Sequence, residues 1–154
     1  MASTPTRIGF VGVGAMGAPM AGCLMKAGYP VAFFDSNPDR TAAFSKEHGI
    51  KPAASLAALG KESDVVITIL PNSAIVHDVL FAEQGLASSL RSGAVVIEMT
   101  SGIPSQTVEF SERLARQGVV LFDAPVSGGV PRARTGELTI MAGGEQADID
   151  AAMP

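Results

Sequence analysis

A glycine-rich turn near the start of the chain constrains the fold more than any other feature. The apolar run Ile8–Val11 leads into Gly12, Gly14 and Gly17, which have the spacing G-x-G-x-x-G. The first glycine of such a turn permits a tight bend, the second lets backbone N–H groups approach a pyrophosphate, and the third lets the next helix pack against the strand. The positive N-terminus of that helix then faces the phosphates.

A second apolar run, over residues 31–34, ends at Asp35. A carboxylate at this distance from the glycines can accept hydrogen bonds from the hydroxyls of a ribose. A structural glycine turn without a ligand is the alternative. Because the strand, turn, helix, second strand and acid occur together, we expect dinucleotide binding.

Apolar strands alternate with helices along the rest of the chain. Further strands are expected at residues 65–70, 94–99, 119–123 and 138–142, with a short edge strand at 50–53, and further helices at 38–47, 55–60, 73–80 and 104–117. This alternation indicates βαβ units. The expected fold is therefore α/β: one Rossmann-type, doubly wound domain over residues 1–154, with a mostly parallel sheet and helices on both faces.

Composition limits the classes of partner. Charged residues make up 17% of the chain, the net charge is −4 and no Lys/Arg cluster occurs, so nucleic acid is not expected as a partner. The uncharged residues 8–25 contain five glycines besides Pro19 and would make a poor membrane helix, so no membrane segment is expected. The single Cys23 excludes an intrachain disulfide and favours a reducing, cytoplasmic location.

Small or polar residues follow the predicted strands, and ligands of a doubly wound sheet bind outside the carboxyl ends of its strands. We expect these residues to converge on one crevice: residues 12–17, Asp35, Leu70, Pro71, Asn72, Thr100, Ser101 and residues 125–129. Asn72 is better placed as a helix cap than as a ligand. Thr100 and Ser101 would bind a nicotinamide amide or a substrate hydroxyl, or cap the next helix.

The segment Ser127, Gly128 and Gly129 can present a hydroxyl and successive N–H groups to an anion. Such a group suits a substrate carboxylate, whereas an ordinary loop joining two strands is the alternative. Arg132 and Arg134 would assist the anion or lie in solvent.

A proton-transfer group is missing from the expected crevice. Oxidation of an alcohol by a nicotinamide needs a general base. The four lysines (Lys26, Lys46, Lys51 and Lys61) follow no crevice-facing strand, and His48 and His77 are expected on helix surfaces. No spacing of metal ligands occurs either. The sequence therefore predicts no catalytic residue and no metal site in this chain.

Three motifs together resemble the β-hydroxyacid dehydrogenases, a family that includes 3-hydroxyisobutyrate dehydrogenase, tartronate semialdehyde reductase and 6-phosphogluconate dehydrogenase. They are GVGAMGAPMA from Gly12, DVVITILPN from Asp64, and DAPVSGG from Asp123 with LTIM from Leu138. The resemblance implies that the cofactor is bound by Gly12, Val13, Gly14, Ala15, Met16, Gly17, Asp35, Leu70, Pro71 and Thr100. It also implies that Ser127, Gly128 and Gly129 hold the substrate carboxylate.

The resemblance further implies that the catalytic lysine lies beyond Pro154, in a helix leading to an all-helical domain. The chain would then be the cofactor domain of a homo-oligomeric, NAD-dependent dehydrogenase acting on a small, 3-hydroxyisobutyrate-like acid, ending in the helix before its last strand. Asp35 favours NAD because a carboxylate repels a 2′-phosphate, although NADP remains possible. Arg40 lies a few residues too late to replace the arginine of NADP-dependent relatives.

Two departures from the family pattern and two other functions remain open. Cys23 replaces a common asparagine, and Arg132 replaces a common glycine of the substrate loop, which leaves the substrate undefined. The other functions are a free-standing NAD(H)-binding module without catalysis and an imine reductase-like relative. The Ser127 to Gly129 segment favours an acid over an imine.

Overall fold

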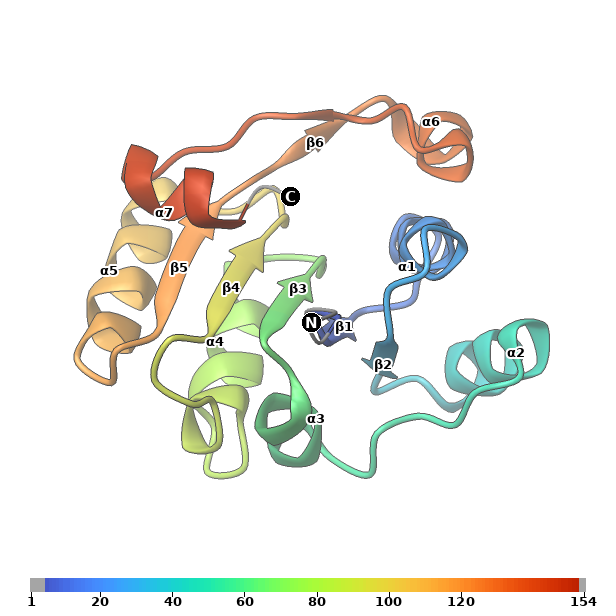
Figure 1. Cartoon of the computed structure of the whole chain (residues 1–154), viewed down its shortest axis with the longest axis horizontal. Coiled ribbons are helices and arrows are strands. Elements are labelled where there is room, and N and C mark those ends of the chain that lie inside the picture. Colours follow the sequence, from blue (N-terminus) through green and yellow to red (C-terminus); the bar gives the residue numbers. More distant parts are fainter. Residues whose placement is uncertain (1–4, 153–154) are drawn as a thin grey trace.

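Five parallel strands form the main sheet, in the order β2-β1-β3-β4-β5 (Figure 1). The computed structural model describes residues 5–152. The strands are β1 (Ile8–Val11), β2 (Val31–Phe34), β3 (Val65–Thr68), β4 (Val95–Glu98) and β5 (Val120–Asp123). Because β1 lies between β2 and β3, the strand order reverses beside it, and this reversal creates the crevice in which doubly wound sheets bind ligands.

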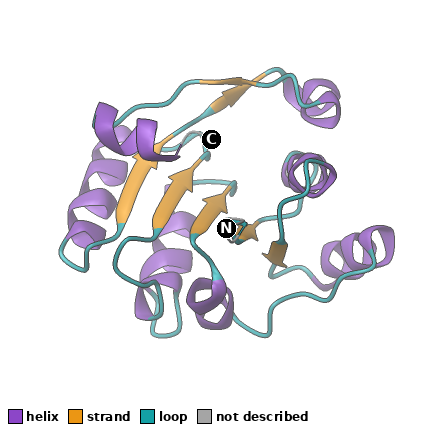
Figure 2. Cartoon of the chain, in the orientation of Figure 1, coloured by secondary structure: helices purple, strands orange, loops and turns teal. Residues whose placement is uncertain are grey.

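Helices cover both faces of the sheet (Figure 2). They are α1 (Gly17–Lys26), α2 (Pro38–His48), α3 (Leu56–Glu62), α4 (Ser73–Phe81), the 3₁₀ turn η1 (Leu86–Ser88), α5 (Pro104–Ala115), α6 (Gly129–Thr135) and α7 (Gln146–Ala152). Helices α3, α4 and α5 bury one face of the strands, around Val66 and Val96. Helices α1, α2 and α6 bury the other face, around Phe10 and Ile67. The expected α/β architecture is confirmed.

Side-chain caps start three of these helices. Asn37 Oδ1 accepts from Asp39 N, Ser55 Oγ accepts from Ala58 N, and Asn72 Oδ1 accepts from Ile75 N at 3.0 Å. Each bond satisfies an N–H group that the first turn of a helix leaves unpaired. The prediction that Asn72 caps α4 is therefore confirmed.

The structure corrects the expectations for three segments. Residues 50–53 form no strand; Pro52 has no N–H to donate, and only the Ala53 N–H reaches β2, at Phe33 O. The strand expected at 138–142 shortens to β7 (Thr139–Ile140), which lies outside the main sheet and pairs antiparallel with β6 (Val126–Ser127). The Ser-Gly-Gly segment therefore joins a strand to the helix α6, not to another strand.

The uncharged stretch from residue 8 to 25 divides into β1, the glycine turn and most of α1. Within residues 5–152, no helix combines the length and the apolar character needed to cross a membrane.

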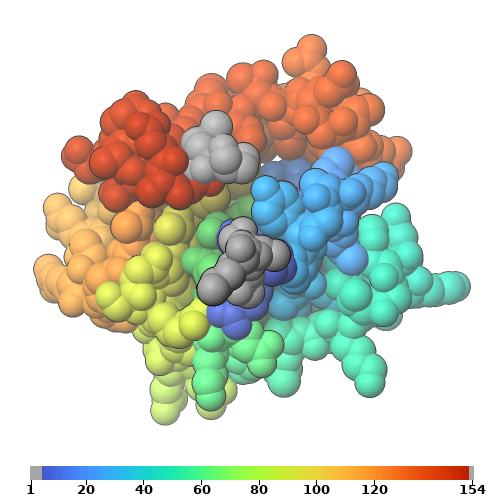
Figure 3. All heavy atoms as spheres, viewed as in Figure 1, coloured from blue at the N-terminus to red at the C-terminus, as the bar shows by residue number. Residues whose placement is uncertain are grey.

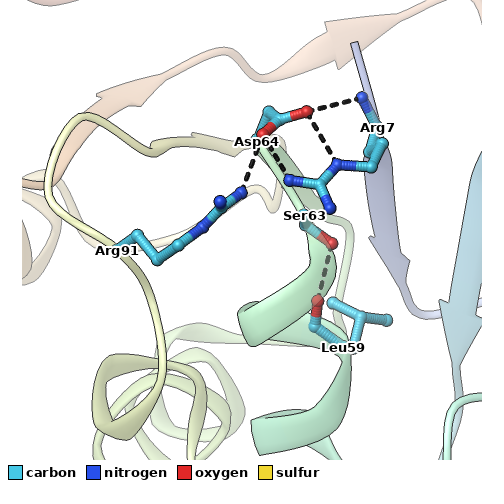
Figure 4. Close-up of polar contacts among 5 residues, drawn as sticks. All are labelled: Arg7, Leu59, Ser63, Asp64 and Arg91. Atoms are coloured by element: carbon cyan, nitrogen blue, oxygen red, sulfur yellow. Dashed lines mark hydrogen bonds and ion pairs between the residues drawn. The ribbon is translucent and has the colours of Figure 1, made fainter. Parts of the chain in front are cut away.

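Asp64 fastens the amino-terminal edge of the sheet (Figure 4). Its Oδ2 accepts from Arg7 N at 2.9 Å and Arg7 Nε at 3.1 Å, and its Oδ1 accepts from Nη2 of Arg7 and of Arg91, at 2.9 and 2.8 Å. The Arg7 hydrogen bonds are the main reason that the pKa of Asp64 lies far below its usual range. One carboxylate thus joins the chain ahead of β1, β3 and β4.

We expect Asp64→Asn to lower the free energy of unfolding at pH 7 by about 1 kcal/mol, because the group is partly exposed and its ion pairs are screened by solvent. A depressed pKa means that the carboxylate stabilises the fold above the pKa of the unfolded chain. This contribution is lost as the pH falls toward the folded-state value. Urea titrations at pH 7 and pH 3 should therefore show a difference from wild type that shrinks in acid. An equal difference at both pH values would contradict this, and the exposed Glu83→Gln serves as the control.

Candidate functional site

A cavity of about 330 Å³ opens at the carboxyl ends of β1, β2 and β3. The glycine turn, the end of β2, the segment after β3 and α4 form its walls. Its lining residues are Val11, Gly12, Gly14, Ala15, Met16, Gly17, Phe34, Asp35, Ser36, Arg40, Ile69, Leu70, Pro71, Ile75 and Val79. This volume is within the range of small-molecule sites. The cavity contains most of the residues expected to bind the cofactor.

The three glycines fill different steric roles. Gly12 has φ +97°, and a Cβ on it would collide with the carbonyl oxygen of Ile69. A Cβ on Gly17 would overlap the carbonyl oxygen of Gly12, so only glycine allows α1 to lie this close to β1. A Cβ on Gly14 would instead meet only the Arg40 side chain, in ordinary van der Waals contact at 3.6 Å from Nη1. Gly14 thus leaves backbone accessible from the cavity.

The N-terminus of α1 is left without a side-chain partner. Met16, its N-cap residue, makes no capping bond, and no acidic residue lies in the first turn. In its first turn, Ala18 N donates to the Gly14 carbonyl oxygen at 3.0 Å and Pro19 has no N–H group, so this helix end offers the positive end of the helix dipole more than a set of free donors. The accessible backbone at Gly14 and this uncapped helix end fit the diphosphate of a dinucleotide.

Asp35 links the end of β2 to the glycine turn. Its Oδ2 accepts from Val13 N at 2.9 Å and its Oδ1 accepts from Asn37 N at 2.8 Å. A carboxylate has about four acceptor positions, so about two remain for ribose hydroxyls. Val13 acts through this N–H group, since its side chain is buried in the core and is absent from the cavity wall.

Apolar side chains form the wall opposite the glycine turn. Leu70 and Pro71 contribute to it as expected, but Ile75 and Val79 of α4 were not anticipated. These two residues are one helical turn apart, so they share a face of α4. Their i, i+4 spacing directly after the Asn72 cap is the signal that could have identified them.

Arg40 and Ser36 both line the cavity, although the place of Arg40 in the chain argued against it as a substitute for the arginine of NADP-dependent relatives. The cap explains the difference. Arg40 N donates to Asn37 Oδ1 at 3.0 Å, which places Arg40 in the first turn of α2. Helical side chains point back toward the N-terminus of their helix, and here this direction leads to the glycine turn.

Thr100 and Ser101 differ in their surroundings. Thr100 is buried and does not line the cavity; its Oγ1 accepts from Leu70 N at 3.0 Å. Ser101 is exposed. Thr100 thus supports the apolar wall from behind.

Ser127, Gly128 and Gly129 are exposed and do not line the cavity. They span the end of β6 and the start of α6, and Figure 1 shows these two elements on the side toward which the strands point, with α6 above α1. In Figure 3 this C-terminal part forms an orange and red band along one side of the molecule. Gly128 and Gly129 have φ values of +133° and +65°, and the Arg132 side chain covers Gly128. Arg132 and Arg134 are exposed, as one of the two interpretations held.

Helix α6 is held against α1 by Cys23, whose Sγ donates to the carbonyl oxygen of Ala133 at 3.4 Å. The residue that departs from the family pattern thus still supplies a donor to α6. The segment proposed for the substrate and the helix that starts the cofactor site therefore share a contact.

The described residues place no lysine and no histidine in the cavity wall. His77 is exposed as expected, whereas His48 is mostly covered because its ring packs on Phe44, with centroids 4.3 Å apart. Within residues 5–152, no three His, Cys, Asp or Glu side chains are grouped to hold a metal.

Two carboxyl groups near the site were not singled out from the sequence. Glu98 ends β4 and is 1% exposed, and burial is the main reason that its pKa is raised. Burial also raises the pKa of Asp123, at the end of β5. A glutamate inside the apolar run of residues 94–99 is the signal that could have identified Glu98.

Comparisons with known proteins agree with this geometry. The sequence model of the NAD binding domain of 6-phosphogluconate dehydrogenase matches residues 7–154. Mouse mitochondrial 3-hydroxyisobutyrate dehydrogenase is 39% identical over 150 residues, which cover 97% of this chain and 44% of that protein. L-threonate dehydrogenase of Cupriavidus necator is 40% identical, over 90% of this chain and 46% of its own length.

Solved structures show the same fold. The Mycobacterium tuberculosis 3-hydroxyisobutyrate dehydrogenase structure with L-serine has a TM-score of 0.89 and 32% identity, over 97% of this chain and 50% of that one. An imine reductase from Myxococcus stipitatus, in complex with NAD⁺, has a TM-score of 0.86, over 96% of this chain and 50% of that one. Its 18% identity indicates a shared fold alone.

The chain spans about half the length of the relatives that it matches. The model match and the identities confirm the resemblance drawn from the three motifs. The chain therefore belongs to the family described as the NAD binding domain of 6-phosphogluconate dehydrogenase, as an oxidoreductase domain similar to that of 3-hydroxyisobutyrate dehydrogenases.

Proposed function

We propose that the chain is the cofactor domain of an NAD(H)-dependent dehydrogenase that interconverts a small β-hydroxyacid and its carbonyl product. One observation carries this proposal: the accessible glycine turn, the uncapped N-terminus of α1 and Asp35 meet in one cavity. These groups match the diphosphate and ribose of a dinucleotide. When bound, the nicotinamide supplies the hydride acceptor or donor.

The substrate class rests on two supports. The names of the relatives include 3-hydroxyisobutyrate and L-threonate, and one solved relative was studied with L-serine. All three compounds are small carboxylates with a hydroxyl on the β-carbon. In this chain Ser127, Gly128 and Gly129 offer a hydroxyl and exposed backbone that can bind such a carboxylate.

In this proposal the chain binds the cofactor and orients the substrate, and another part of the parent protein supplies the proton-transfer group. Lys26, Lys46, Lys51 and Lys61 all lie outside the cavity wall. We place the catalytic lysine in a further helical domain of the parent protein, which we expect to be a homo-oligomer. The free Cys23 thiol supports a reducing compartment such as the cytoplasm.

The cavity also supports a preference for NAD with acceptance of NADP. Asp35 favours a free ribose diol and repels a 2′-phosphate. Arg40, with Ser36, supplies a cation and a hydroxyl beside it. Opposite charges at the same corner of the cavity reduce discrimination between the two cofactors.

A binding module without catalysis is the second candidate, because the cavity wall lacks a lysine or a histidine. It predicts cofactor binding with no turnover by the complete protein. An imine reductase would be identified by turnover of cyclic imines in place of acids.

The complete protein should oxidise β-hydroxyacids such as 3-hydroxyisobutyrate or L-serine with NAD⁺, whereas residues 1–154 alone should bind NADH without turnover. NADH fluorescence titration measures the first property and steady-state absorbance at 340 nm the second. Turnover by residues 1–154 would contradict the assignment of the base to another domain. Failure of the complete protein with every acid tested would favour the binding module.

Asp35→Ala and Arg40→Ala should change cofactor choice in opposite directions. Loss of the ribose acceptor should weaken NADH about tenfold and NADPH less, and loss of the cation should weaken NADPH about tenfold and NADH less. Dissociation constants for both cofactors measure the effect, and the exposed Arg116→Ala is the control for charge. Equal losses for both cofactors would contradict these roles.

Ser127→Ala should raise the KM for the acid about tenfold in the complete protein and leave the NADH dissociation constant unchanged, because only the substrate loses a hydrogen bond. Initial rates at saturating NAD⁺ measure the change. Ser105→Ala, an exposed serine of α5 outside the cavity wall, is the comparison. A shift in NADH affinity with an unchanged KM would place Ser127 on the cofactor instead.

A further inference from the structure

The last residues of β3, β4 and β5 form a polar row across the sheet. Thr68 pairs with Glu98, and Glu98 pairs with Asp123, in the register of the parallel strands. Thr68 and Glu98 are 0% and 1% exposed, whereas Asp123 is half-buried. Side chains of paired positions share a face, and this row lies on the face covered by α4 and α5.

Glu98 joins the segments that follow β3 and β4. Its Oε1 accepts from Thr100 N at 2.7 Å and, at the longer distance of 3.4 Å, from Thr68 Oγ1. Thr100 Oγ1 in turn accepts from Leu70 N at 3.0 Å. A single buried carboxylate therefore fixes Thr100, and through Thr100 it fixes the backbone of Leu70.

The fixed backbone belongs to the cofactor cavity. Leu70 and Pro71 form part of its apolar wall, and the carbonyl of Ile69 lies where a Cβ of Gly12 would be. A shift of Leu70 would move the wall relative to the glycine turn. Glu98 itself is absent from the cavity wall, so it acts on a ligand only through these neighbours.

We propose that Glu98 is a positioning residue for the cofactor, and that its ionised form holds Thr100 and Leu70 in the binding geometry. This inference rests on the proposed cofactor-binding function. Glu98 would thus affect the affinity for the cofactor without contacting it, unlike the residues that line the cavity.

If Glu98 has this role, its titration should make cofactor affinity depend on pH. Burial raises its pKa, and the charged group that acts on it from a neighbouring strand is Asp123 of β5, which raises it further. A charged acceptor makes hydrogen bonds about twice as strong as a neutral one. Cofactor affinity should therefore increase as the pH rises through the pKa of Glu98.

Stability should respond in the opposite direction. A carboxyl whose folded-state pKa is raised stabilises the fold below its unfolded pKa, and this contribution is lost as the pH rises. A residue with a merely structural role would make affinity and stability fall together. A positioning role predicts that, as the pH rises, cofactor affinity increases while the contribution of Glu98 to stability decreases. Both trends should be lost when Glu98 is replaced by an uncharged residue.

The test measures NADH dissociation constants of the chain from the ordinary glutamate pKa, about pH 4.5, up to about pH 8, for wild type, Glu98→Gln, Glu98→Leu and the exposed control Glu109→Gln. Wild type and the control should tighten about fivefold with rising pH. Glu98→Gln keeps an acceptor oxygen and should lose this pH step. Glu98→Leu should bind about tenfold more weakly throughout. Asp123→Asn should move the step to lower pH.

Persistence of the pH step in Glu98→Gln, or wild-type affinity in Glu98→Leu, would overturn the inference and leave the proposed function intact. Absence of NADH binding by wild type would overturn both. If Glu98→Leu does not fold, Thr100→Val replaces it, since it removes the acceptor of the Leu70 N–H together with the hydroxyl that interacts with Glu98. Unchanged affinity and unchanged amide exchange at Leu70 in that variant would also overturn the inference.

Discussion

The contact between Gly17 and the carbonyl oxygen of Gly12 determines the geometry of the cofactor cavity. No side chain fits between them, so the first turn of α1 lies directly against the end of β1. This approach places the N-terminus of α1, which has no side-chain cap, on the cavity, and Val13 of the same turn donates its N–H to Asp35. The end of α1 and the carboxylate of Asp35, which we propose bind the diphosphate and the ribose, are therefore positioned by one steric constraint.

Three acids secure the ends of the strands around this constraint. Asp64 holds the amino-terminal edge through Arg7 and Arg91, in partial contact with solvent. Asp35 and Glu98 hold the carboxyl edge through backbone N–H groups. Asp64 is paired with cations and its pKa is lowered, whereas Glu98 is buried without one and its pKa is raised. The carboxyl edge of the sheet thus contains one carboxyl group, that of Glu98, whose charged form is disfavoured by burial.

The sequence predicts the parts of the fold that depend on local chemistry. Strand periodicity, the glycine spacing and the Asn72 cap all indicate structure within a few residues of themselves. The antiparallel pair of β6 and β7, which are separated in the chain by α6, could not be predicted in this way, because Pro125 and Gly128 indicate a turn without indicating its partner strand. The place of Arg40 also depends on tertiary packing, since it follows from the direction of α2 relative to the glycine turn.

The two hydrogen bonds that Asp35 accepts, from Val13 N and from Asn37 N, have a consequence for laboratory redesign of cofactor choice. The carboxylate that we propose binds the ribose also joins the glycine turn to the segment after β2. Its removal to admit a phosphate leaves two backbone donors without an acceptor. Asparagine is the smallest change that keeps one acceptor oxygen at this position. A variant redesigned to accept NADP would therefore have a less rigid glycine turn, unless a second substitution supplies a new acceptor for Val13 N and Asn37 N.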